Sequence, residues 1–189
     1  MALSSIALSS RALLKLGADT IASFDEGTAE AEVAANLYPS TRDALLSAHP
    51  WSFATAQAVL PKLADQPVAD FSTAFQLPSD FLRALSAGPS GRGRGMEYRI
   101  AERRLHTNSS DAVLSYIFRP DETDFPPFFD QVLITRLAAE FCIPLTESTT
   151  RSESLHKLAE AEFRRAKMID SQQDTPGRIE DFLLVEVRS

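Results

Sequence analysis

The sequence is poor in cysteine and glycine and has no long apolar run, and each shortage excludes a class of protein. Its 189 residues include one cysteine, Cys142, so no internal disulfide can form, and either a reducing compartment or a fold indifferent to redox conditions is expected. Seven glycines rule out a collagen-like fibre. The apolar runs are only a few residues long, well short of the roughly 20 residues needed to span a bilayer. We therefore expect no membrane partner, and the first 17 residues do not resemble a signal peptide.

The remaining composition is that of a folded chain. Hydrophobic residues make up 44% of the sequence and charged residues 24%, both close to the average for globular proteins. A chain of this length builds one ordinary domain, or one domain with a sizeable insertion, around a core that can be buried.

Charge is distributed unevenly along the chain. The net charge is −7, but residues 83–119 carry seven basic and three acidic side chains, whereas residues 120–189 carry eight and fourteen. Five arginines fall within thirteen residues: Arg92, Arg94, Arg99, Arg103 and Arg104. Clustered arginines suit a surface that faces DNA or a neighbouring subunit. The alternative is a solvated loop and hairpin, which we favour because Glu97 and Glu102 lie among the arginines.

Helical periodicity occurs at both ends of the sequence. A first helix is expected from a cap at Ser4 or Ser5 to Gly17. A second begins at Thr28 and runs towards residues 49–50, and Pro39 must kink it or split it.

Two more helices are expected after residue 124. One starts at about Pro126 or Pro127 and ends at Pro144, and the last begins near residues 149–150. Apolar residues at spacings of three and four continue along the last helix to Ile169.

Between the helices the pattern changes to short apolar stretches separated by proline and glycine. The stretches are residues 53–60, 71–77, 81–85, 98–100 and 113–118. Such runs between turn residues are typical of an antiparallel β region. The segment 84–95 is the connection expected to be most mobile, because glycines cluster there.

These patterns predict an α+β fold, mainly α. Residues 1–50 and 120–173 form a four-helix bundle, residues 51–119 an inserted antiparallel β lobe, and residues 174–189 an extended C-terminal arm. The apolar residues of the arm have high strand propensity, so the arm either pairs with another chain or folds back onto its own domain. Its candidate binding residues are Arg178, Ile179, Phe182, Leu183, Leu184, Val185 and Val187.

No pattern in the sequence predicts catalysis. The three histidines are far apart, and none has a second ligand at metal-binding spacing. No serine lies in a nucleophile-elbow context, and the glycine-rich stretch 91–95 lacks the Lys-Ser/Thr of a phosphate-binding loop. We therefore expect neither an enzyme nor a bound metal or cofactor.

One ordered set of segments resembles a known family. Residues 45–54 (LLSAHPWSFA) resemble a signature of the phage tail tubular protein A family, the head-to-tail adaptors beneath the portal. The similarity continues in order through residues 75–83, 98–100, 105–108, 116–117 and 125–140 and the last helix, covering about residues 3 to 172.

The resemblance implies a structural virion protein with no catalytic residues. It would form a ring, of twelve copies in this family, that joins the portal protein to a tail or nozzle protein and lines the channel for passing double-stranded DNA. It would be assembled in the host cytoplasm and sit in the neck of the virion. In related adaptors the C-terminal segment engages the portal, which assigns that role to the arm.

Three aromatic residues of the matching segments, Trp51, Phe53 and Tyr116, form a core signature. A tryptophan directly after His-Pro is more simply a core anchor than a partner contact. The alternative to the adaptor is a nucleic-acid-binding module that uses the basic segment Arg92–Arg104.

Overall fold

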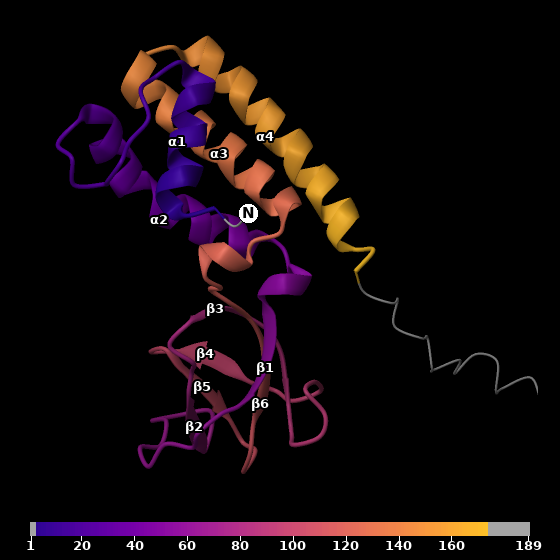
Figure 1. Ribbon diagram of the computed structural model, residues 1–189. Coiled ribbons are helices and arrows are strands. Elements are labelled where there is room, and N and C mark those ends of the chain that lie inside the picture. The colour runs from indigo at the N-terminus through magenta and orange to yellow at the C-terminus, as the bar shows by residue number, and fades with distance from the viewer. Residues whose placement is uncertain (1–2, 174–189) are drawn as a thin grey trace, which may run out of the picture.

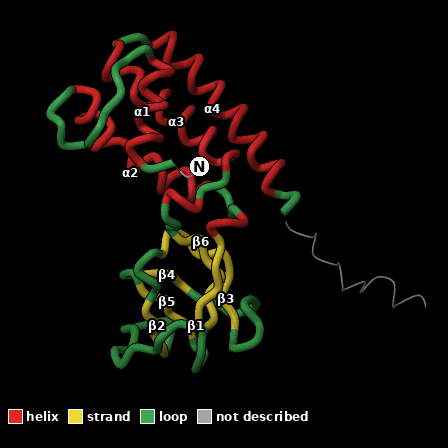
Figure 2. The backbone as a smooth tube through the Cα atoms, viewed as in Figure 1, coloured by secondary structure: helices red, strands yellow, loops and turns green. Residues whose placement is uncertain are grey.

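Helices and strands occupy opposite ends of the molecule in the computed structural model, which describes residues 3–173 (Figure 1). The four helices are α1 (Ser5–Leu16), α2 (Ala29–Ala48), α3 (Pro127–Thr146) and α4 (Thr149–Asp170). The six strands are β1 (Thr55–Val59), β2 (Thr73–Gln76), β3 (Phe81–Gly88), β4 (Arg99–Ala101), β5 (Arg104–Thr107) and β6 (Val113–Phe118). All six strands lie between α2 and α3 in sequence, and Figure 2 shows them gathered below the helices. The predicted α+β class is confirmed.

The helices begin where local capping predicts. Ser4, Thr28 and Ser148 each accept a hydrogen bond through the side-chain hydroxyl from a backbone N–H three residues later. These bonds satisfy donors that have no partner inside a helix. Gly17 ends α1 with a φ of 71°, a left-handed conformation that glycine adopts without strain.

Neither internal proline ends its helix. Pro39 lies inside α2, which continues as one helix, so the alternative of two separate helices is wrong. Pro144 lies inside α3, which continues to Thr146, so the expectation that Pro144 ends it is also wrong. A proline removes only one N–H from the helical ladder, and tertiary packing of the other residues keeps the helix together.

Helix α3 is the centre of the helical part. It packs against α1, α2 and α4, whereas α1 and α2 contact each other much less. Most of its side chains are therefore buried, including Phe129, Leu133, Leu137 and Phe141. A four-helix bundle, in which each helix borders two others, is not confirmed by this arrangement.

The strands form two antiparallel sheets of three strands each. The strand order is β1-β6-β3 in the first sheet and β2-β5-β4 in the second. Strand β5 was not among the predicted stretches, because Leu105 is the only strongly apolar residue among its four and the strand follows β4 almost directly. A two-residue turn joins the two strands, with φ angles of 51° at Glu102 and 58° at Arg103. This left-handed geometry matches the twist of a tight hairpin.

Each end of the molecule has its own hydrophobic core. The helical core contains Leu8, Leu13, Leu46, Trp51 and Phe129. The strand core contains Leu60, Phe75, Leu105, Leu114 and Tyr116 and fills the space between the two sheets. Strand β6 contributes to both, because Ile117 at its far end packs into the helical core.

Two neighbouring leucines of α1 test this assignment of the helical core. Leu13 is fully buried and Leu14 is 60% exposed, although both lie in the same helical turn. We expect Leu13→Ala to lower the free energy of unfolding by about 2–5 kcal/mol, because it leaves a cavity. The matched control Leu14→Ala should change it by less than about 0.5 kcal/mol. Urea unfolding followed by circular dichroism measures both, and equal effects would contradict the packing described.

Candidate functional site

The structure separates the five candidate arginines into two groups. Arg92 and Arg94 lie in the loop after β3, where the Ser86 hydroxyl donates to the carbonyl of Gly93 at 2.8 Å. Gly93 also lies against Gln57 and Ser115. These side chains alternate along β1 and β6 with the residues of the strand core, so the loop covers the outer face of the first sheet.

The other three arginines belong to the β4–β5 hairpin of the second sheet. Arg99 forms an ion pair with Asp70 at 2.7 Å, and Arg104 lies 3.9 Å from Asp65. Both pairs are largely exposed, so each contributes no more than about 1 kcal/mol to stability. Arg103 has no ion pair with any residue from 3 to 173. The sheet assignments thus place the two groups on opposite sides of the strand part, not in one basic patch.

Two of the three signature aromatics meet at the joint between helices and strands. Trp51 is fully buried, and its indole N–H donates to the carbonyl of Leu45 at 3.1 Å. Its ring lies edge-on to Phe129 and Phe163, with centroids 5.2 Å and 5.6 Å away. Phe53 packs 5.0 Å from Phe129. The arrangement is that of a core anchor.

Tyr116, the third signature residue, lies in the strand core, away from Trp51 and Phe53. Its hydroxyl donates to Asp80 at 3.3 Å, and its ring stacks on Phe81. Burial and the neighbouring Asp80 carboxylate raise the pKa of Tyr116 above its ordinary value. The structure therefore does not bring the three residues into one site.

The last residue of α4 binds the joint through a buried carboxylate. Asp170 is 4% exposed and accepts hydrogen bonds from the Ser52 hydroxyl at 2.7 Å and from the Ser52 backbone N–H. The Nε2 atom of His49 lies 3.6 Å from the same carboxylate. Burial lowers the pKa of His49, although Asp170 opposes this effect. These contacts attach the end of α4 to the segment that enters the strands.

Ser52, His49 and Asp170 include the residue types of a catalytic triad but not its geometry. In a triad the serine donates to the histidine, which removes its proton. Here Ser52 donates directly to the carboxylate, so the histidine is not placed to activate it. The contacts position the chain and do not generate a nucleophile.

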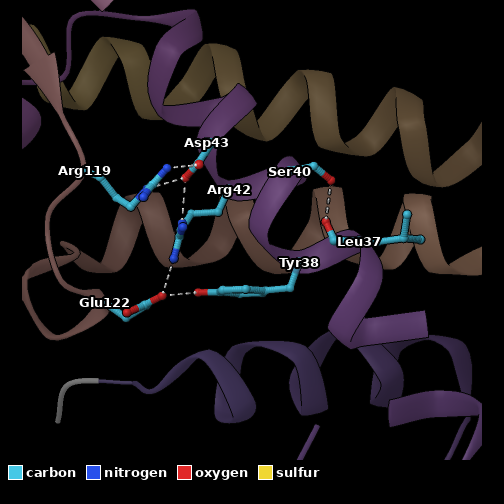
Figure 3. Close-up of polar contacts among 7 residues, drawn as sticks. All are labelled: Leu37, Tyr38, Ser40, Arg42, Asp43, Arg119 and Glu122. Atoms are coloured by element: carbon cyan, nitrogen blue, oxygen red, sulfur yellow. Dashed lines mark hydrogen bonds and ion pairs between the residues drawn. The ribbon is translucent and has the colours of Figure 1, made fainter. Parts of the chain in front are cut away.

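A second polar cluster joins α2 to the segment that returns from the strands (Figure 3). Arg119 donates to the Asp43 carboxylate from Nε, at 3.0 Å, and from Nη2. Arg42 bridges Asp43 at 2.9 Å and Glu122 at 2.8 Å. The Tyr38 hydroxyl donates to the same Glu122 oxygen at 3.1 Å. Burial, followed by the charge of Glu122, raises the pKa of Tyr38 well above its ordinary value of 10.

Sequence reasoning missed both polar clusters. Apart from the adjacent Arg42–Asp43 pair, each of their contacts joins residues at least 76 positions apart in the chain. No local spacing signals such contacts. Among the contacts at the joint, only the role of Trp51 as a core anchor was predictable from the sequence, because His-Pro directly precedes it.

An open groove of about 400 Å³ lies on the helical part, between α2 and α4 and above α3. Its walls are mainly apolar. The residues that line it are Leu37, Ser40, Thr41, Ala44, Leu45 and Ala48 of α2, Val132, Arg136 and Glu140 of α3, and Ala159, Glu160 and Phe163 of α4. In Figure 3 the Ser40 hydroxyl of this wall donates to the carbonyl of Leu37.

The described part of the chain, residues 3–173, offers neither a metal site nor a membrane-spanning helix. No cluster of three or more His, Cys, Asp or Glu side chains there is arranged to hold a metal ion. None of the helices in that range combines the length and hydrophobicity that crossing a membrane requires. The seven arm residues, from Arg178 to Val187, lie outside the described residues.

Comparisons with known proteins add no assignment: no protein-family model matches the sequence, and no curated protein matches it significantly. Among residues 3–173, the surfaces available for binding include the α2–α4 groove and the two arginine groups.

The Tyr38 cluster predicts a specific sensitivity to alkali. Above about pH 10 the unfolded chain ionises this tyrosine, while the folded chain keeps it protonated, so folding stability falls as pH rises. The loss should approach about 1.4 kcal/mol per pH unit from this residue. Urea unfolding of the parent and of Tyr38→Phe between about pH 9 and pH 11 measures it. The variant should show a shallower fall, and an unchanged slope would contradict the burial of this hydroxyl.

Proposed function

We propose that the chain is a structural virion protein, a head-to-tail adaptor that forms a ring between the portal and the tail. The observation that carries the proposal is the ordered resemblance that begins with residues 45–54. The placement of that segment supports it, because residues 45–54 include the end of α2, the buried Trp51 and the entry to the strands. A segment that determines the angle between two halves of a subunit is one that an assembly protein depends on.

In this proposal the helices act as one bundle and the strand lobe projects from it. DNA passes through the centre of the ring without sequence-specific contacts, and a tail or nozzle protein binds below. An acidic chain suits such a channel, because a wall that repels phosphate lets the duplex slide. The net charge of −7 is consistent with this role.

The arm, residues 174–189, is proposed to engage the portal. The helix that precedes the arm is fixed in place, because Asp170 at the end of α4 is hydrogen-bonded to Ser52. Asp170 lies three residues before the last described residue, Gln173. A binding segment that starts from a rigid point loses less entropy on docking than one that starts from a loose terminus.

Ring formation is proposed to pair opposite charges on neighbouring subunits. The hairpin arginines Arg103 and Arg104 belong to the basic block, and the acidic block includes α3 and α4. Arg103 supports this role best, because it has no ion pair with residues 3–173.

The alternative function, a nucleic-acid-binding module that uses Arg92–Arg104, gains no support from the arrangement of these residues. Tight phosphate binding needs cations on one surface, and the two groups lie on different sides of the strand part. The following experiments distinguish the two functions.

The adaptor role predicts addition of about twelve copies of the chain to one portal ring of the same phage, observed by native mass spectrometry. Deletion of residues 176–189 should abolish the addition while circular dichroism stays that of the folded protein. If the full chain does not add to the portal and instead shifts duplex DNA in a salt-dependent manner, the nucleic-acid role replaces the adaptor role.

The proposed lateral contact predicts that Arg103→Glu with Arg104→Glu weakens subunit association at least about tenfold, and that added salt weakens the parent ring. The matched control is Arg164→Glu with Arg165→Glu, the same charge change on exposed positions of α4. It should leave association unchanged or strengthen it. Sedimentation of assembled rings measures both. Equal weakening in the two double variants would contradict the proposed contact, because net charge alone would then explain the effect.

A further inference from the structure

The α2–α4 groove exists because two helices share a support without contacting each other closely. Both α2 and α4 pack on α3. Along α4 the residues buried against it are small, Ser152, Ala159 and Ala166, so this helix contacts α3 along a narrow stripe. Ala44 and Ala48 of α2 remain exposed on the opposite wall. The volume of about 400 Å³ is within the range of about 300–1,000 Å³ typical of ligand pockets.

We infer that residues 179–187 of the same chain occupy this groove in the free protein. This segment contains the longest apolar run of the sequence, Phe182–Val185, and the groove is mainly apolar along its length. Burial of both surfaces removes apolar area from water, which favours the contact.

The point where the described chain ends makes this occupant reachable. Helices α2 and α4 both end at the joint, because His49, the residue after α2, lies 3.6 Å from Asp170, the last residue of α4. Phe163, at the joint end of the groove, is seven residues before Asp170, or about 10 Å along the helix axis. Residues 171–173 form a turn at the end of α4, and residues 174–178 can span up to about 17 Å, which is enough to reach back to that point.

The length of the segment also fits the groove. The lining residues of α2, from Leu37 to Ala48, extend over about 16 Å of helix. Nine residues cover about 13 Å as a helix and more when extended. The segment therefore has the reach to contact most of the groove.

Charge at the joint end of the groove favours the same occupant. Lys167 lies over the ring of Phe163 at 5.4 Å, where the segment would enter. Glu180 and Asp181 come directly before the apolar run. Linkage through α4 gives the segment a high effective concentration, so it outcompetes a second copy of the chain.

This inference does not depend on the adaptor role. If the arm also engages a portal, the same apolar side chains cannot be in the groove at that time, so portal and groove compete for them. Failure to bind a portal would leave the docking intact, and failure to dock would leave portal binding intact.

Disulfide trapping in the full-length chain tests the docking. The pair Ala44→Cys and Leu184→Cys should form an intramolecular disulfide at least about tenfold faster than the pair Val59→Cys and Leu184→Cys. Val59 is 72% exposed on β1 and provides a control away from the groove. The native Cys142 is fully buried, so it stays in place. Peptide mass spectrometry identifies the linked residues, and thermal melts confirm that both variants fold.

A further substitution, Phe182→Asp in the Ala44/Leu184 pair, should slow trapping to the rate of the control. Equal rates at positions 44 and 59 would overturn the inference. Fast trapping that Phe182→Asp does not slow would overturn it as well, because the apolar contact would not be the cause. Covalent dimers as the main product would show that a second copy occupies the groove instead.

Discussion

The orientation of the strands relative to the helices depends on a packed cluster of aromatic rings at the joint. The indole of Trp51 lies among Phe53, Phe129 and Phe163, which come from three different segments of the chain. The pairs of Trp51 with Phe129 and Phe163 are edge-on, a geometry that contributes about 0.5–1.5 kcal/mol per pair beyond the area buried. Because α2, α3 and α4 all approach this point, loss of the cluster would release both ends of the molecule at once.

Polar contacts surround the aromatic cluster and restrict its geometry further. On one side the Asp170 carboxylate accepts hydrogen bonds from the backbone N–H and the hydroxyl of Ser52. On another side the Asp43 carboxylate accepts hydrogen bonds from Nε and Nη2 of Arg119. Packing brings the two parts together, whereas these directional bonds select one angle between them. The helical and strand surfaces are therefore held in a constant relation to each other.

The features that could be predicted from the sequence are those that depend on neighbouring residues. Caps such as Ser4 and Thr28 act within one turn, so helix starts were predictable from neighbouring residues. The effect of the internal prolines was not predictable in this way: α2 continues through Pro39 and α3 continues past Pro144, because tertiary packing overrode a local preference. Strand β5 was missed because Leu105 is the only strongly apolar residue among its four.

The candidate binding surfaces were harder to predict than the helices and strands. The sequence left two alternatives for the clustered arginines, a basic patch and a solvated loop and hairpin, and we favoured the second. In the structure Arg92 lies in the loop over the first sheet and Arg103 in the hairpin of the second. The groove arises from three helices whose residues 37–48, 132–140 and 159–163 have no local relation. The joint contacts connect residues as far apart as Ser52 and Asp170, and only the fold brings them together.

The position of Trp51 has a spectroscopic consequence. It is the only tryptophan in the chain, and it is fully buried at the joint with the ring of His49 4.8 Å away. Its emission therefore comes from one site in a dry environment, without any label. A change in the angle between the helical and strand parts would alter the contacts of this ring without first changing the amount of helix or strand. The protein thus contains its own optical reporter of the joint.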